Sequence, residues 1–529
     1  MIMKIRKSVA VVLAFVLCMS FAACQNKDAK TEEKGNTFTW FVPMYNGNVI
    51  QNAGDQYCWQ EIQKRTGTTI EFIHPPAGSE NDTFNVRVAS GDLPDIITWS
   101  WVSNFAGGPT KAISDGIIID IQQYMEDAPN YKALLESVPG AMSVATLDDG
   151  AVYGFTQPTT DPIISATEGL VIRKDWLDAV GMDVPVTIED WYNVLKAFKT
   201  GDPNKNGKAD EIPFICTKEA QISAFATAWG VRNGYHSDPK QDGKIVFGPI
   251  QPEFKEFLTE MAKWYSEGLI DAEFPVNARK NIDEKVTTNK AGSFYGTIGS
   301  QLGSYNLEGV KQEKSFNMIG VNAPIGKSGI SYSNNDGLLQ RSGNQCVSIS
   351  KKNKHPKETV KLLDYIYSDE GRTLINWGKE GESYEIVDGK PQYTDLIMNN
   401  PEGKTRLDAI AEYSVPIFGY FTPFYLDSYS AINLTLPQQK DAAAIWADMD
   451  TSLCMPFLFP NEKEASVISK NGADINTYAS ECLVKFVIGQ TPINEFDSYV
   501  EGMKRMGVDD LVKVYQDMYD RYQKKEAGN

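Results

Sequence analysis

The sequence predicts an α/β protein with more than one lobe. In residues 37–101, and again from about residue 168, short β-branched and aromatic runs alternate with amphipathic segments of helical period. This alternation is typical of a mostly parallel sheet covered by helices. The chain has 529 residues, 42% of them hydrophobic. At about 100–200 residues per domain, that length predicts two or three lobes.

The first alternating stretch begins with TFTWFVPMY (37–45), which predicts a strand. CWQEIQKRTG follows as a helix that ends at Gly67, and TTIEFIHPP as a second strand. NDTFNVRVASGDLPDIITWSW repeats the unit, with a helix to Ala89, a turn and the apolar strand IITW. Trp99 and Trp101 stand at the carboxyl end of that strand, where ligands of such sheets bind.

The second stretch begins at EGLVIRKDWLDAVGM. Thr187 opens TIED, a capping box for the helix WYNVLKAFK, which runs into the acidic loop GDPNKNGKADEIP (201–213) and then the strand IPFICT. Further helices are predicted in PEFKEFLTEMAKWYSEG, in HPKETVKLLDYIYSDEG and over residues 494–524. The last of these has a stripe at helical spacing that predicts core packing: Leu511, Tyr515, Met518, Tyr519 and Tyr522.

Residues 1–23 predict a targeting segment, with a basic start, an apolar stretch over residues 9–17 and a small-residue exit. The apolar stretch is shorter than the roughly 20 residues of a membrane-spanning helix. FAAC resembles a bacterial lipobox, with Phe21 where leucine is favoured, and implies cleavage before Cys24 and a diacylglycerol lipid on its sulfur. An ordinary secretory cleavage site is the alternative. The polar residues 24–36 predict a flexible tether to the outer face of the cell membrane.

The charge of the chain argues against nucleic acid as a partner. The formal charge is −18 at pH 7, and removing Lys4, Arg6 and Lys7 with the leader brings the mature chain to −21. Nucleic acid binding needs clustered Lys and Arg instead. No segment after the leader is apolar enough to cross a bilayer.

The cysteines do not predict a disulfide scaffold, because none forms a CxxC pair and they are widely spaced. Apart from Cys18 in the leader and Cys24, they are Cys58, Cys216, Cys346, Cys454 and Cys482. Free buried thiols are predicted, and a single disulfide stays open.

Known catalytic motifs are absent from the sequence. His74, His236 and His355 are far apart and none belongs to HExxH, and there is no GxSxG elbow. GVNAPIGKS (320–328) has five residues between its glycines, whereas a phosphate-binding loop needs four. A pair of carboxylates brought together by the fold for sugar cleavage stays open.

Several stretches together, in their order and spacing, carry a family resemblance. They are ASGDLPDII, GLVIRKDWLDAVGMDVPVTIEDWYNVLKAFKTGDPNKNGKADEIPF, AGSFYGTIGS, YSDEGRTLINWGKEGESYEIVDGKPQYT and FVIGQTPINEFDSYVEGMKRMGVDDLVKVYQDMYDRYQ. Nearly the whole mature chain resembles the family 1 extracellular solute-binding proteins of ABC importers, in particular the long lipoprotein branch with alginate- and oligosaccharide-binding members.

The resemblance implies a two-lobed fold like that of periplasmic binding proteins (class II type), with hinge crossings and a ligand cleft between the lobes. The implied lobes are residues 37–168 with 340–400 and residues 169–339 with 401–529. Ligand binding would favour a closed form that membrane permease subunits recognise. The protein is then a monomer without catalytic activity.

The resemblance also implies a calcium ion in the acidic loop, away from the cleft. The implied ligands are the side chains of Asp202, Asn204, Asn206, Asp210 and Glu211 and the backbone carbonyl of Lys208. Oxygen-only ligands favour calcium over zinc or copper, and the spacing D-x-N-x-N-G opens like an EF-hand loop. The ion would be structural. An empty polar turn is the alternative.

The predicted ligand-binding residues are aromatic side chains near strand ends or in family-like loops, because such rings stack on sugars. They are Trp99, Trp101, Trp229, Tyr295, Trp377 and Tyr384, with Arg372 and Glu382 for hydroxyl contacts. The leading hypothesis is a carbohydrate receptor of an importer. A secreted glycan-degrading enzyme and a receptor for a non-sugar solute are the alternatives.

Overall fold

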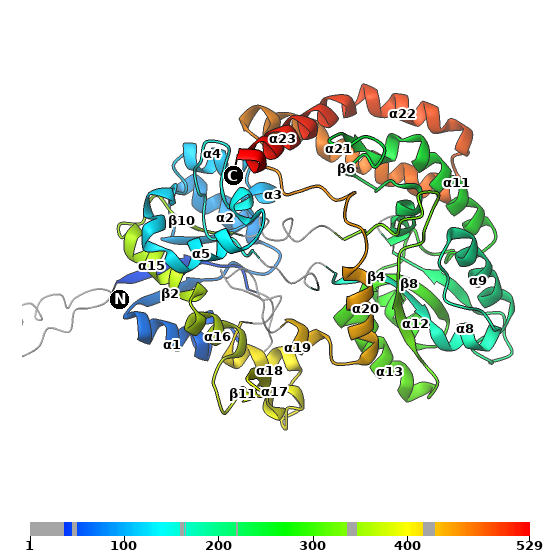
Figure 1. Cartoon of the computed structure of the whole chain (residues 1–529), viewed down its shortest axis with the longest axis horizontal. Coiled ribbons are helices and arrows are strands. Elements are labelled where there is room, and N and C mark those ends of the chain that lie inside the picture. Colours follow the sequence, from blue (N-terminus) through cyan, green and yellow to red (C-terminus); the bar gives the residue numbers. More distant parts are fainter. Residues whose placement is uncertain are drawn as a thin grey trace, which may run out of the picture.

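The computed structural model describes residues 36–44, 50–158, 163, 166–217, 221–335, 346–415 and 429–528. Two lobes lie side by side, each built around a four-stranded sheet with helices (Figure 1). This arrangement confirms the α/β class. The predicted leader and Cys24 lie outside the described residues.

The sheet of the first lobe has the order β10-β3-β1-β2. β1 (Thr37–Phe41) pairs in parallel with β2 (Thr69–Ile73) and β3 (Ile96–Trp99), and β10 (Cys346–Ile349) joins β3 antiparallel. The edge strand β10 therefore comes from a distant part of the sequence. The helices of this lobe include α1 (Tyr57–Thr66), α2 (Glu80–Ser90), α4 (Gly108–Ser114), α5 (Pro129–Ser137), α6 (Ala141–Ala145), α15 (Pro356–Tyr367) and α16 (Asp369–Trp377).

Successive residues of β1 bury the two faces of this sheet. Trp40 packs edge-on against Trp59 of α1 at 5.2 Å between ring centroids. Phe41 lies 6.0 Å from Phe84 of α2 and contacts a separate apolar cluster. Because side chains alternate along a strand, this pattern explains why both faces carry large aromatic residues.

The sheet of the second lobe has the order β5-β8-β4-β9. β4 (Glu168–Arg173) pairs antiparallel with β8 (Ala291–Thr297) and β9 (Met318–Val321), and β5 (Ile212–Ile215) pairs in parallel with β8. Two of these three pairings are antiparallel, so the prediction of a mostly parallel sheet is wrong for this lobe. Its helices include α8 (Lys174–Val180), α9 (Ile188–Thr200), α11 (Pro252–Ser266), α12 (Arg279–Thr287), α13 (Ser304–Gln312) and α20 (Pro437–Ala447).

Helix α20 packs closely on this sheet because the sheet has glycine at the contact. A Cβ atom on Gly169 would lie 2.3 Å from the ring of Trp446, which is itself buried. The indole Nε1 of Trp446 donates to the carbonyl of Val321 at 3.0 Å, which fixes the helix on β9.

The C-terminal helices span both lobes along one side of the molecule (Figure 1). α21 (Glu462–Val487) begins next to α4, where the hydroxyl of Ser114 donates to Glu462 at 3.4 Å, and its second half is buried in the core of the second lobe. α22 (Phe496–Arg505) and α23 (Val508–Gly528) follow. The predicted stripe on α23 is confirmed at Leu511 and Met518, which are buried.

Smaller elements complete the fold. They are the hairpins β6 (Tyr235–Ser237) with β7 (Ile245–Phe247) and β11 (Tyr384–Val387) with β12 (Lys390–Tyr393), and the short helices α3 (Trp101–Asn104), α17 (Asp395–Met398), α18 (Arg406–Tyr413) and α19 (Tyr429–Asn433). Among the described residues, no helix combines the length and the apolar character needed to cross a membrane.

The five described cysteines are free thiols, in accord with the prediction. Cys58, Cys216, Cys346 and Cys482 are buried, and burial raises their pKa. A raised pKa keeps these thiols protonated and unreactive.

Candidate functional site

The acidic loop joins α9 to β5 at the surface of the second lobe. Thr187 caps α9 through the predicted capping box, since its hydroxyl accepts from the N–H of Asp190 at 3.1 Å and Asp190 accepts from the N–H of Thr187 at 2.9 Å. The loop then turns around Asp202, whose carboxylate accepts from the backbone N–H groups of Asn206 at 3.0 Å and Gly207 at 3.1 Å. One carboxylate therefore organises the turn.

The polar side chains after Asp202 converge on Asp210. The amide of Asn206 donates to Asp210 at 2.9 Å, and that of Asn204 lies 3.5 Å from the same oxygen. The amide oxygen of Asn206 accepts from the N–H of Lys208 at 2.8 Å. Hydrogen bonding from Asn206 is the main cause that lowers the pKa of Asp210.

Glu211 has a buried carboxylate oxygen without a partner in the described part of the chain. Its Oε1 is buried and has no hydrogen-bond partner among the described residues. Burial raises the pKa of Glu211, and the negative charges of Asp202 and Asp210 raise it further. A cation between these groups would offset both the desolvation of the Glu211 carboxylate and its repulsion by Asp202 and Asp210. The loop therefore fits a hard cation bound by oxygen ligands.

No three His, Cys, Asp or Glu side chains in the described part of the chain lie close enough to share a metal ion. In this loop, Asn204 and Asn206 occupy positions between the carboxylates. A site here would therefore depend on amide and backbone oxygens as well as carboxylates.

Trp99 and Trp101 lie at the carboxyl end of β3, as predicted, but their rings pack inside the first lobe. The ring of Trp99 stacks on Phe84 at 4.2 Å, and that of Trp101 meets Phe84 edge-on at 5.7 Å. Their exposed fractions are 3% and 1%. A ligand role for either residue stays a prediction.

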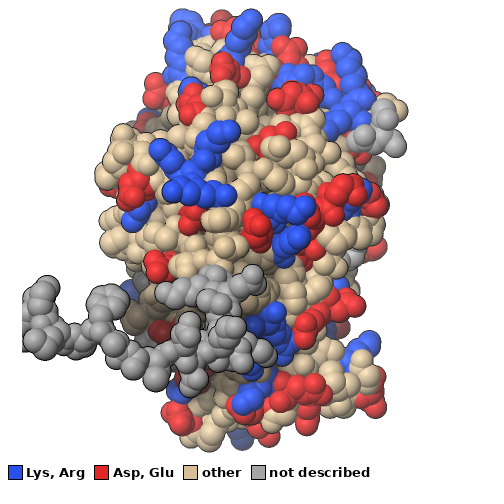
Figure 2. Space-filling view, turned by 90° about the vertical axis from the view of Figure 1, so that its left-hand side faces the viewer, with Lys and Arg blue, Asp and Glu red and all other residues tan. Residues whose placement is uncertain are grey.

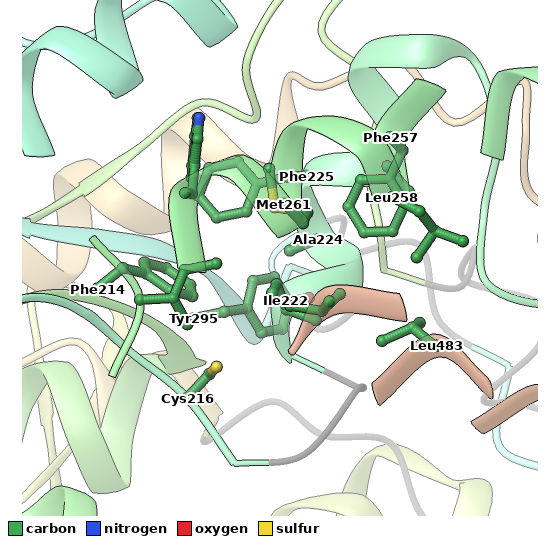
Figure 3. Close-up of a cluster of buried hydrophobic side chains, with 14 of the residues drawn as sticks. Phe214, Cys216, Ile222, Ala224, Phe225, Phe257, Leu258, Met261, Tyr295 and Leu483 are labelled. Carbon is green, nitrogen blue, oxygen red and sulfur yellow. The ribbon is translucent and has the colours of Figure 1, made fainter. Parts of the chain in front are cut away.

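Trp229 and Tyr295 belong to the second lobe. Trp229 ends a short helix, η3 (Ser223–Trp229), is half-buried, and packs edge-on against Phe257 at 5.8 Å. Tyr295 lies in β8 among buried apolar side chains that include Phe214 and Ile222 (Figure 3). Trp229 is thus the more accessible of the two.

The remaining predicted residues lie on α16 and in the segment that follows it in the first lobe. Trp377 and Tyr384 are nearly buried, with ring centroids 6.3 Å apart. Glu382 is exposed and paired with Lys379, and Arg372 on α16 is half-buried. The structure therefore brings the predicted ligand residues together in three groups, two in the first lobe and one in the second.

Three polar contacts around Asn334 and Asn335 were not predicted from the sequence. The amide of Asn335 donates to the carbonyl of Glu168 at 2.9 Å, and Cys454 Sγ contacts the carbonyl of Asn335 at 3.0 Å. The guanidinium of Arg232 donates to the carbonyl of Asn334 at 2.6 Å. Such contacts join segments far apart in the sequence, so no local pattern indicates them.

Buried His236 and half-buried His74 both contact backbone groups. The ring of His74 lies 2.8 Å from the carbonyl of Val42 and accepts from the N–H of Ala53 at 3.1 Å. The ring of His236 lies 3.1 Å from the carbonyl of Gly234. Burial lowers the pKa of both side chains, in His236 to about 4. These contacts fit structural roles.

Comparison with known proteins gives one family match. The family model described as bacterial extracellular solute-binding protein matches residues 47–373. Lipoprotein LipO of Bacillus subtilis is 26% identical over 98% of this chain and 99% of its own length. The fructooligosaccharide ABC transporter substrate-binding protein FusA of Streptococcus pneumoniae is 25% identical over 89% of this chain and 88% of its own.

Solved structures give the same architecture. FusA in complex with kestose has a TM-score of 0.72 at 22% identity and covers 92% of this chain and 100% of its own. The alginate-binding protein AlgQ2 without calcium ion also has a TM-score of 0.72 at 22% identity, covering 92% and 98%. A further FusA structure is described as an EF-hand mutant with fructo-nystose. At these identities the structures support the two-lobed fold.

Proposed function

The chain belongs to the family of bacterial extracellular solute-binding proteins, and from that membership we propose that it is the oligosaccharide receptor of an ABC importer. The single observation that carries the proposal is its likeness to FusA, which extends over both lobes and nearly the full length of each chain. The receptor would hold its sugar between the lobes and deliver it unaltered to permease subunits.

The two-lobed architecture supports capture by closure. Each lobe has its own sheet and core, so the lobes can rotate about their connecting segments without losing internal packing. A ligand that contacts both lobes binds the closed form more tightly and shifts the equilibrium toward it. The side chain of Asn335 donates a hydrogen bond to the carbonyl of Glu168, the first residue of β4. We place one hinge at this pair, because the chain passes from the first lobe to the second just before Glu168.

The ligand class is proposed from aromatic side chains and from the relatives. FusA is named for fructooligosaccharides and AlgQ2 for alginate, both carbohydrates. Trp229, half-buried at the end of η3, offers a ring that a sugar can stack on. The high negative charge of the chain favours a neutral sugar over a polyuronate.

We also propose a structural calcium ion in the acidic loop. Asp202, Asp210 and Glu211 would supply carboxylate oxygens, Asn204 and Asn206 amide oxygens, and Lys208 its carbonyl. The unpartnered Oε1 of Glu211 and the mutual repulsion of the carboxylates support the assignment. Bound calcium would supply positive charge that ties the end of α9 to β5 and takes no part in sugar binding.

The receptor is proposed to be anchored at the outer face of the cell membrane by a lipid on Cys24, after removal of residues 1–23. The support is the lipobox-like FAAC and the likeness to LipO, which is named as a lipoprotein. Mass spectrometry of the mature protein from a bacterial membrane would test this directly, because acylated and unmodified Cys24 differ by the mass of the lipid.

Calorimetry against a panel of oligosaccharides tests the function. The panel would include kestose, longer fructans, galactosides and alginate oligomers, and chromatography would follow each titration. We expect saturable one-site binding of a sugar that is recovered intact. Shortened products would instead assign the protein to the glycan-degrading enzymes, and binding confined to non-sugar solutes would overturn the carbohydrate assignment.

A further inference from the structure

A cluster of exposed basic side chains lies on the first lobe between β10 and the first turns of α15. We call it the basic turn; it consists of Lys351, Lys352, Lys354, His355, Lys357 and Lys361. The whole chain has 51 Lys and Arg against 69 Asp and Glu, so a local excess of positive charge runs against the overall composition.

The backbone of the basic turn is held firmly by hydrogen bonds. The N–H of Lys351 donates to the carbonyl of Ile117 at 3.0 Å, and that of Lys352 to the hydroxyl of Ser350 at 3.0 Å. The side chain of Asn353 donates to Thr359 at 2.8 Å and accepts from the N–H of His355 at 2.7 Å. A fixed backbone therefore presents several free ammonium groups.

Few carboxylates neutralise these lysines. Asp127 lies 3.2 Å from Lys357 and 3.9 Å from Lys361, and Glu358 is exposed on α15. In the described part of the chain, the three lysines that precede α15 take part in no ion pair; they are Lys351, Lys352 and Lys354. The basic turn thus keeps a net positive charge.

The basic turn lies at the end of the sheet where the chain enters the fold. The N–H of Ser350 donates to the carbonyl of Asp95, and the N–H of Thr39 donates to the carboxylate of Asp95, both at 2.9 Å. The end of β10 and the beginning of β1 therefore lie at the same end of the sheet. One strand, β3, lies between them, so they are roughly 10 Å apart.

A lipid on Cys24 would keep this edge close to the membrane. The tether residues 25–36 number 12, which span at most about 40 Å when extended and about 20 Å on average as a flexible coil. The view of this side of the molecule shows Lys and Arg groups in several places, interspersed with Asp and Glu groups and with uncharged surface (Figure 2).

We infer that the basic turn docks on an anionic phospholipid surface, an inference that rests on the proposed anchoring at Cys24. The lysines would be attracted to the lipid phosphates when the basic turn lies within a Debye length, about 10 Å, of the membrane surface. This attraction would orient the first lobe with the amino ends of its parallel strands toward the membrane. A lipid surface is favoured over other polyanions because the tether holds the basic turn beside it.

Vesicle binding of the unlipidated protein tests this inference independently of sugar binding and of acylation. The protein would comprise residues 25–529, which retain every described element. Cosedimentation would use vesicles of phosphatidylcholine alone and with 30% phosphatidylglycerol. We expect binding to the anionic vesicles only, falling steeply between 20 and 300 mM salt.

Charge reversal identifies the surface. The variant Lys351→Glu, Lys352→Glu, Lys354→Glu should reduce partition onto anionic vesicles at least about tenfold. The control Lys280→Glu, Lys314→Glu, Lys470→Glu makes the same charge change at exposed lysines of the second lobe and should reduce partition less than about twofold. Both variants should bind the sugar of the unmodified protein with unchanged affinity, which separates this test from that of the receptor function.

Three outcomes would overturn the inference. The first is equal binding to neutral and anionic vesicles, or no binding to either. The second is an equal loss in the two triple variants. The third is equally tight binding to soluble polyglutamate at the same charge concentration, which would assign the basic turn to an acidic polymer.

Discussion

Arg521 on the last helix forms an ion pair with Asp148 of the first lobe, with 2.6 Å between Nε and Oδ2. The same guanidinium makes two bonds to Glu464 at the start of α21, at 2.5 and 2.7 Å. One turn further on, the ammonium of Lys525 donates to the carbonyls of Ser143 and Thr146. Helix α23, whose first half packs on the second lobe, therefore ends bonded to the first.

Replacing Arg521 with methionine should lower the free energy of unfolding by about 2–3 kcal/mol. The substitution leaves Glu464, whose side chain is 9% exposed, without its cation. Urea denaturation followed by circular dichroism measures the change. The matched control is Lys513→Met on the same helix, which breaks an exposed pair with Asp517 and should cost less than about 0.5 kcal/mol. Equal losses in the two variants would contradict a structural role for Arg521.

The sequence predicted the local elements of the fold well, because their signals lie within a few residues. Alternation in TFTWF, the capping box at Thr187 and the stripe on α23 each correspond to elements of the structure. The pairing of β10 with β3, across some 250 residues of chain, has no local signal, since an edge strand of four residues is set by what it packs against.

The surroundings of the candidate ligand residues likewise could not be predicted from local sequence patterns. Trp99 stands at a strand end, which sequence reasoning could predict, but the direction of its ring depends on Phe84 from α2. The bond from Arg232 to Asn334 joins two loops about 100 residues apart. Position along an element can be predicted from local pattern, whereas side-chain surroundings depend on tertiary contacts.

Removing the carboxylates of the acidic loop should cost more stability in the presence of calcium than in its absence, where only their hydrogen bonds within the loop are lost. The variant Asp202→Ala, Asp210→Ala would lose the gain in melting temperature that 1 mM calcium gives the unmodified protein, because ligand binding to the folded state alone stabilises it. Differential scanning calorimetry in calcium and in EGTA measures this. Equal losses under both conditions would refute the metal assignment.

Glu211→Gln gives a sharper test of the same loop. The raised pKa of Glu211 means that its folded form binds a proton more readily than its unfolded form. Without calcium, the free energy of unfolding therefore falls as the pH rises from the ordinary pKa of Glu211, which applies to the unfolded chain, to the raised pKa of the folded chain. Glu211→Gln should remove that loss in EGTA at pH 7 and also weaken the response to calcium. A variant that is destabilised in EGTA would contradict the repulsion argument.

His236 should make the protein less stable in mild acid. Burial lowers its pKa from 6.5 to about 4, so the unfolded chain takes up a proton that the folded chain does not. Stability is then lost as the pH falls from 6.5 toward 4, by about 3 kcal/mol in total. Urea midpoints measured between pH 7 and pH 4.5 should fall more steeply for the unmodified protein than for His236→Gln. The exposed His355→Gln is the control, and its slope should match that of the unmodified protein.

Trp229→Ala should weaken binding of the captured sugar about tenfold while costing the fold only about 1–2 kcal/mol. The ring is half-buried and meets Phe257 edge-on, so truncation exposes little of the core but removes a stacking surface. Trp229→Phe keeps an aromatic face and should restore most of the affinity. Tyr265→Ala is the matched control, because it removes another half-buried ring from the same lobe, one that packs on Phe274. Calorimetry with the sugar found in the panel gives the affinities, and unchanged binding in Trp229→Ala would show that this ring does not contact the ligand.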